Sequence, residues 1–339
     1  MNKDTTGESH DTERDASNAH PEELLAINEK LVIASIQQHE YAESARLEEQ
    51  RAKADLGQLR ADHDGLSLSL EQLRGTVAVI QAAYEREHHI AESLQRPLMM
   101  EIPEDAFPGL SVATLYAPAL DEAEVGGDFF DALLLTNGRG GSRVALLVGD
   151  VTGKGLVAAA LAGRVKEVLR AFLHEDSDPA RTLARLNDYL CETVGEAIGG
   201  HFGSSAVLPV ALSLAVLDPE TGLASFTSAG AEPPALLRAD GTAVEVEVGG
   251  LLLGIRPQEV YTKTVLPLSP GDAVLLLTDG ITEVRRGDEF LGYEGMLQLA
   301  MQPPIGASAR DTIHAILEGA RAFGGGFRDD VCLLLARRQ

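Results

Sequence analysis

The stretch Leu146-Leu-Val-Gly-Asp-Val-Thr-Gly-Lys-Gly155 places an aspartate where a run of apolar residues gives way to glycines. A short apolar run that ends at a turn signal is typical of a buried β-strand. We therefore expect a strand over Val144–Val148, with Asp150 carried to the rim of the hydrophobic core. The end of this expected strand is therefore a candidate functional site.

Apolar runs alternate with turn signals on both sides of this stretch. Upstream, we expect strands over Leu110–Ala117 and Phe129–Leu135, and a hairpin turn at 137–141. Further strands are expected at 210–217, 224–228, 235–238, 244–248, 261–266, 273–277 and 331–336, and helices at 156–173, 179–198, 292–301 and 309–323. Grouped strands and paired helices predict an α+β fold in which sheet packs on sheet and helices cover the outside.

Four aspartates occupy similar settings, each next to an expected strand: Asp128, Asp150, Asp279 and Asp329. Carboxylates that meet at one end of buried strands repel one another unless a cation lies between them. With oxygen donors alone and no His or Cys nearby, the set suits Mg²⁺ or Mn²⁺ rather than Zn²⁺. The pattern therefore predicts a divalent cation site.

Glycines beside these aspartates allow two interpretations. Gly126, Gly127, Gly153, Gly155 and Gly280 leave out side chains where a ligand would need room. The alternative is that each Asp-Gly pair only makes a turn, the commoner role of such a pair taken alone. The turn interpretation leaves unexplained why strand, aspartate and glycine recur together.

Composition and short motifs exclude several classes of protein. The chain has 28 Lys and Arg against 52 Asp and Glu, a net charge of −24, so we expect neither nucleic acid nor a membrane surface as a partner. Neither a phosphate-binding loop nor a dinucleotide fingerprint is present at the required spacing. With two isolated cysteines, no signal peptide and no apolar membrane span, we expect a reduced, cytoplasmic protein.

The first part of the chain differs from the rest. Residues 1–20 are polar and aperiodic, and we expect them to be disordered. Pro21 favours a helix start, and we expect a helical segment over 21–95. Apolar residues over 56–94 step alternately by three and four, a heptad seam that predicts a coiled-coil homodimer. The alternative is a helix packed on its own globular domain, because three glycines in that stretch each cost about 1 kcal/mol of helix stability.

Residues 96–339 resemble the SpoIIE/RsbU-type branch of the PPM (PP2C-like) metal-dependent serine/threonine phosphatases. Five motifs occur in the order of that family, across about two thirds of the chain. They are Val125-Gly-Gly-Asp-Phe-Phe-Asp131, Gly149-Asp-Val-Thr-Gly-Lys-Gly155, Ser228-Ala-Gly-Ala-Glu-Pro-Pro234, Leu277-Thr-Asp-Gly-Ile-Thr-Glu283 and Arg328-Asp-Asp-Val331.

The resemblance implies an α-β-β-α sandwich of two antiparallel sheets flanked by helix pairs, with two Mn²⁺ or Mg²⁺ ions at one end. The carboxylates that match metal-binding and catalytic positions are Asp128, Asp150, Asp279 and Asp329, with Asp150 as the bridge. Val151 matches the residue that supplies a backbone carbonyl. Asp330 is a reserve ligand, and Asp131 is a reserve group outside the ligand set.

Two positions depart from relatives. Ala231 stands where many relatives carry histidine, and Thr152 stands where eukaryotic members carry a histidine proposed as general acid. We therefore expect protonation of the leaving oxygen to fall to water or to the substrate's surroundings, and catalysis to be slow.

The resemblance implies hydrolysis of phosphoserine or phosphothreonine by a metal-activated water, without a covalent intermediate. It further implies a phosphorylated anti-anti-sigma (STAS-domain) protein as substrate, in a partner-switching pathway of sigma-factor and stress-response regulation. The helical segment would act as dimeriser and regulatory lever. The alternatives are a catalytically weak or inactive scaffold of the same fold, and another metal hydrolase such as a nuclease, which the charge disfavours.

Overall fold

The computed structural model describes residues 21–95, 99, 102–119, 126–136, 142–199 and 208–339. The chain divides into two compact units, residues 1–81 and 82–339. The expected disordered segment 1–20 and the hairpin turn at 137–141 lie outside the described residues.

One helix, α1 (Pro21–Gln95), accounts for the described part of the first unit and confirms the predicted helix start. Apolar side chains of its seam, such as Leu66, Leu70 and Leu73, are exposed along the helix. No helix among the described residues is both long and apolar enough to cross a membrane.

The second unit contains two five-stranded antiparallel sheets. The first sheet has the strand order β1 (Leu110–Ala117), β12 (Val331–Arg338), β9 (Ala273–Leu277), β6 (Ala235–Leu237) and β7 (Ala243–Glu245). The second has the order β2 (Asp128–Thr136), β3 (Ser142–Val151), β4 (Val210–Asp218), β5 (Leu223–Ala229) and β8 (Thr264–Pro267). A small hairpin pairs β10 (Arg285–Arg286) with β11 (Glu289–Phe290).

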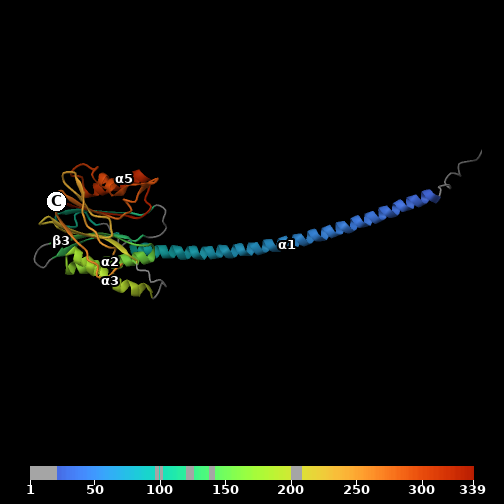
Figure 1. The fold of residues 1–339 in the computed structure, drawn as a ribbon, viewed down its shortest axis with the longest axis horizontal. Coiled ribbons are helices and arrows are strands. Elements are labelled where there is room, and N and C mark those ends of the chain that lie inside the picture. Colours follow the sequence, from blue (N-terminus) through green and yellow to red (C-terminus); the bar gives the residue numbers. More distant parts are fainter. Residues whose placement is uncertain (1–20, 96–98, 100–101, 120–125, 137–141, 200–207) are drawn as a thin grey trace, which may run out of the picture. The chain divides into compact units, whose positions relative to one another are not determined.

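Helix pairs cover the outer faces of the two sheets (Figure 1). Helices α2 (Leu156–Glu175) and α3 (Pro179–Gly199) pack on the second sheet, and α4 (Gly292–Ala300) and α5 (Ala309–Gly324) pack on the first. A third apolar layer fills the space between the sheets. The architecture confirms the predicted α+β sandwich of sheets flanked by helix pairs.

Alternation along the strands decides which residues face the seam between the sheets. On β3, Ala145 and Leu147 belong to the core under α2 and α3, whereas Leu146 and Val148 belong to the core between the sheets. The same even-numbered rule holds on β2, β9 and β12. Successive side chains of a strand point to opposite faces. The even-numbered residues Asp128, Asp150, Thr278 and Asp330 therefore follow the same alternation as the residues that pack between the two sheets.

Candidate metal centre

Asp128 and Asp150 lie directly opposite each other on neighbouring strands. Their Cα atoms are paired in the antiparallel register of β2 and β3. Asp128 is only 4% exposed, and its pKa is raised well above the ordinary value, first by burial and then by repulsion from Asp150. Like charges placed directly opposite destabilise a sheet. This pair is therefore a costly arrangement unless something neutralises it.

Thr278 fixes the orientation of Asp128. The Thr278 hydroxyl donates to Asp128 Oδ2 at 2.8 Å and accepts from the Cys332 backbone N–H at 2.9 Å. The Thr278 N–H in turn donates to the Cys332 carbonyl. Residues that follow β9 and begin β12 in the first sheet thus hold a carboxylate of the second sheet.

Asp279 and Asp329 lie just beyond strand ends, at the exposed rim of the same cluster. Burial and then repulsion from Asp150 raise the pKa of Asp279 to about 6. The pKa of Asp150 is also raised, first by burial and next by repulsion from Asp329. The Asp329 carboxylate lies 3.7 Å from the Lys154 ammonium. Four carboxylates from four separate stretches therefore act on one another here.

Asp330 differs from its neighbour Asp329 because it is buried and already bonded. Its Oδ2 accepts from the Tyr116 hydroxyl at 2.7 Å, and its Oδ1 accepts from the Ala119 backbone N–H at 3.0 Å. A Cβ added to Gly126 would overlap the same carboxylate. Asp330 thus contacts both Ala119 and Gly126, on either side of the undescribed residues 120–125.

The glycines pack closely against backbone and carboxylate oxygens. A Cβ on Gly127 would overlap the Val151 carbonyl oxygen and crowd Asp150, and a Cβ on Gly280 would overlap the Asp330 carbonyl. Side chains are therefore excluded at these two positions by the protein's own backbone and carboxylate oxygens, which is a different reason from the room for a ligand that the sequence suggested. Gly153 and Gly155 instead have φ of 103° and 80°, so they serve the turn that follows β3.

Asp131 faces away from the other carboxylates. It has the parity of the β2 residues that pack under α2, and there Arg170 donates to it from Nε at 2.5 Å and from Nη2 at 2.8 Å. The Lys166 ammonium lies 3.7 Å away. The Asp131 carboxylate is thus paired with basic residues of α2.

A pocket of about 260 Å³ opens beside the cluster and is lined by Asp150, Asp279, Glu232, Glu283 and Ala231 among others. Ala231 therefore contributes only a methyl group to this pocket. Thr152 is exposed in the turn after β3. Neither of the two positions where relatives have histidine therefore supplies an imidazole to this acidic pocket.

The donor set fits a hard divalent cation. The side-chain donors of the cluster are carboxylates, and the backbone of Gly127 packs closely against the carbonyl oxygen of the buried Val151. Within the described part of the chain, no three His, Cys, Asp or Glu side chains already enclose a common ion position. Carboxylates with no cation between them repel, so we expect these side chains to turn inward when an ion binds.

Sequence reasoning missed the residues that support the carboxylates. Thr278 stands within a quoted motif, but its hydroxyl bond to Asp128 depends on how the two sheets pack. Tyr116 lies on β1, more than 200 positions from Asp330 along the chain. The sequence did contain a signal for the basic partners of Asp131. Lys166 and Arg170 are four residues apart on α2 and so share one face of that helix.

This architecture and this cluster define a class. Two antiparallel sheets between helix pairs, with carboxylates gathered at one end of the seam, form the PP2C-type phosphatase fold. The chain belongs to the SpoIIE family: the family model described as stage II sporulation protein E matches residues 140–339, more than half of the chain.

Individual relatives agree with this assignment. Phosphoserine phosphatase RsbU of Bacillus subtilis is 24% identical over 267 residues, which cover 78% of this chain and 73% of RsbU. Protein IcfG of Synechocystis sp. is 29% identical over 194 residues, which cover 51% of this chain and 30% of IcfG.

Among solved structures, the RsbU and RsbW domains of Rv1364c from Mycobacterium tuberculosis superpose with a TM-score of 0.56 at 30% identity, covering 68% of this chain and 62% of that one. The SiaA-PP2C domain of Pseudomonas aeruginosa has the same TM-score at 16% identity, covering 78% of this chain and 99% of that domain, which shows the shared fold. The chain spans less than two thirds of IcfG and of the Rv1364c chain.

Proposed function

We propose that this chain is a metal-dependent protein serine/threonine phosphatase. The observation that carries the proposal is the convergence of Asp128, Asp150, Asp279 and Asp329, in which burial and then mutual repulsion raise the pKa of the first three. Carboxylates kept together at such cost are explained by a bound cation. Membership of the SpoIIE family and the similarity to a phosphoserine phosphatase point to phosphoprotein hydrolysis.

The residues that would hold Mn²⁺ or Mg²⁺ are these four aspartates and the Val151 carbonyl. Two such ions, when bound, would lower the pKa of a water molecule and neutralise phosphoryl oxygens. Thr278 would keep Asp128 in one orientation, and Asp150 would lie between the remaining carboxylates. Because Asp330 is bonded to Tyr116 and Ala119, we assign it the role of fixing β1 and Ala119 to the start of β12 rather than that of a ligand.

The acidic pocket has a consequence for the leaving group. Neither Ala231 nor Thr152 can donate a proton as an imidazolium would. The serine or threonine oxygen that leaves must then take its proton from water, and this slows the reaction relative to a site with a positioned general acid. A low turnover number is therefore part of the proposal.

The test is hydrolysis of a phosphoserine protein with and without Mn²⁺. Asp150→Asn should abolish the Mn²⁺-dependent rate while the circular dichroism spectrum is unchanged. The matched control is Asp105→Asn, an exposed aspartate near the start of β1, where activity should match that of the wild type. Undiminished activity in Asp150→Asn would reject the assignment, and absence of Mn²⁺ binding in calorimetric titration would favour an inactive scaffold.

The finer proposal concerns partners. We infer that the substrate is a phosphorylated STAS-type anti-anti-sigma protein and that two chains pair through residues 56–94. Similarity to RsbU supports the first inference. The exposed seam of α1 supports the second, because a stripe of leucines left in water favours association with a second copy.

A further inference from the structure

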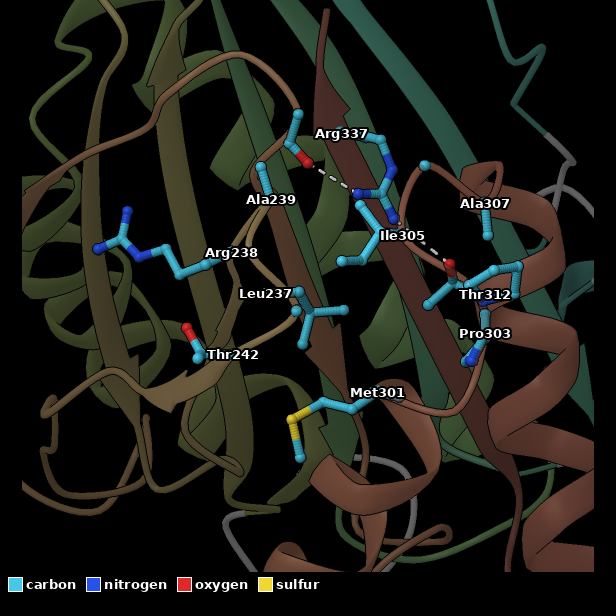
Figure 2. Close-up of a pocket in the computed structure, with 15 residues that line it drawn as sticks. Leu237, Arg238, Ala239, Thr242, Met301, Pro303, Ile305, Ala307, Thr312 and Arg337 are labelled. Carbon is cyan, nitrogen blue, oxygen red and sulfur yellow. Dashed lines mark hydrogen bonds between the residues drawn. The ribbon is translucent and has the colours of Figure 1, made fainter.

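Figure 2 shows a second pocket, of about 230 Å³. It lies at the opposite end of β12 from the carboxylate cluster, because Arg337 lines it whereas Asp329 precedes the start of that strand. It is bordered by the turn between β6 and β7 and by the loop between α4 and α5, where Ile305 comes within contact of the position that a Gly241 Cβ would take. Arg337, near the end of β12, lines it. Asp329 precedes the other end of this eight-residue strand, so about 25 Å separates the two sites.

The Arg337 guanidinium carries a charge that is only partly matched. Nη1 donates to the Gly271 carbonyl at 2.7 Å, and Nη2 lies 3.4 Å from the Thr312 hydroxyl (Figure 2). Nε is buried without a hydrogen-bond partner. A guanidinium has five N–H donors, so most of them are unused among the described residues. Burial lowers the pKa of Arg337, as expected for a cation removed from water without an anion bonded to it.

The carboxylate that could neutralise Arg337, Asp272, is already hydrogen-bonded to other groups. Asp272 accepts from Arg238 Nη1 at 2.8 Å, from the Ala239 N–H at 2.8 Å and from the Ser269 N–H at 2.9 Å. Its charge still favours the protonated form of Arg337 from a distance. Because Nε is enclosed, the donors of Arg337 left for an anion that the pocket receives from outside are the second N–H groups of Nη1 and Nη2.

The other walls are apolar and partly exposed. The apolar lining includes Leu237, Met301, Pro303 and Ile305. Ile305 is 76% exposed and Met301 41%, so both side chains have apolar surface that a ligand in the pocket could cover. These walls would contact the body of a ligand, whereas Arg337 would contact its charge.

We propose that this pocket is a binding site for a small free carboxylate with a branched apolar body. A carboxylate presents two coplanar oxygens that match the donors of a guanidinium. Inorganic phosphate lacks an apolar part to cover Met301 and Ile305, and the volume is too small for more than a short chain of atoms. The site is independent of the proposed phosphatase reaction.

The experiment uses the full chain with methyl-labelled Met and Ile residues and two probes, 4-methylpentanoate and 4-methylpentanamide. We expect saturable shifts of the Met301 and Ile305 methyl resonances with the acid, and at least tenfold weaker binding of the amide. Ile305→Glu supplies a competing carboxylate at an exposed position and should weaken binding of the acid at least tenfold, read at Met301. Arg337→Gln should have the same effect.

The matched control is Val260→Glu, which adds the same charge at a position 79% exposed and outside the pocket lining. It should bind the acid as the wild type does. Equal affinity for acid and amide, no saturable shift with either, or unchanged binding in Ile305→Glu would overturn the proposal. Should Arg337→Gln fail to fold, the comparison of Ile305→Glu with Val260→Glu remains decisive.

Discussion

Asp279 should make the metal-free protein less stable as pH rises. Its pKa is raised from 3.8 to about 6, first by burial and then by repulsion from Asp150. A raised carboxyl pKa means that the folded chain retains a proton which the unfolded chain releases. The penalty is absent below the unfolded pKa, grows between pH 4 and 6, and is complete above the folded pKa.

The size of this penalty follows from the shift. About two pKa units correspond to about 3 kcal/mol. Because the Asp279 side chain reaches solvent at the rim of the cluster, screening reduces this value, and we expect about 1 to 2 kcal/mol. Asp279→Asn resembles the neutral acid, so the variant should match the wild type near pH 4 and exceed its unfolding free energy by that amount at pH 7.5.

The assay is urea unfolding followed by tyrosine fluorescence, in EDTA, at several pH values between 4 and 7.5. Asp105→Asn serves as the control and should follow the wild type at every pH. Adding Mn²⁺ at pH 7.5 should stabilise the wild type more than Asp279→Asn. A stability difference between variant and wild type that is the same at pH 4 and pH 7.5 would refute the reasoning.

Three further substitutions test other parts of the structure. Gly127→Ala should reduce phosphatase activity at least tenfold, because the new methyl group would overlap the Val151 carbonyl. Thr278→Val removes the hydroxyl that bonds Asp128 and should lower the urea unfolding free energy by about 1 to 3 kcal/mol. Leu70→Glu places a charge on the seam of α1 and should halve the mass measured by light scattering.

Each of these has a counterpart that should behave differently. Gly65→Ala lies in open space on α1 and should leave activity intact. Thr278→Ser keeps the hydroxyl and should retain most of the stability. Ser69→Glu adds the same charge beside the seam rather than on it and should leave the mass unchanged. If a variant and its counterpart give the same result, the structural reason given for that variant is wrong.

Strand positions could be predicted wherever a buried strand has a continuous apolar run. The strands over 110–117 and 273–277 begin and end as expected, because both are long enough or apolar enough to dominate their surroundings. The expected strand at 261–266 instead begins at Thr264, where pairing with Phe226 of β5 starts. The two-residue strands β10 and β11 were missed, since charged residues dominate them.

The sequence could predict which aspartates belong to the candidate site, but not how their side chains are oriented or which residues support them. Placing Asp150 and Asp279 at strand ends requires only local periodicity. Distinguishing Asp329 from Asp330 requires knowing which side chain turns into the seam, and that depends on the pairing of β12 with β1. The bond between Tyr116 and Asp330 is a product of the same pairing.

The parity of β2 and β3 limits how these strands can change in length. Inserting one residue between Val144 and Asp150 would turn that aspartate toward α2 and put an apolar side chain in its place. Inserting two residues would preserve the facing direction but shift Asp150 out of line with Asp128. Homologous proteins that keep this pair should therefore vary in length at the distant end of the hairpin, and designed chimeras should exchange the hairpin there.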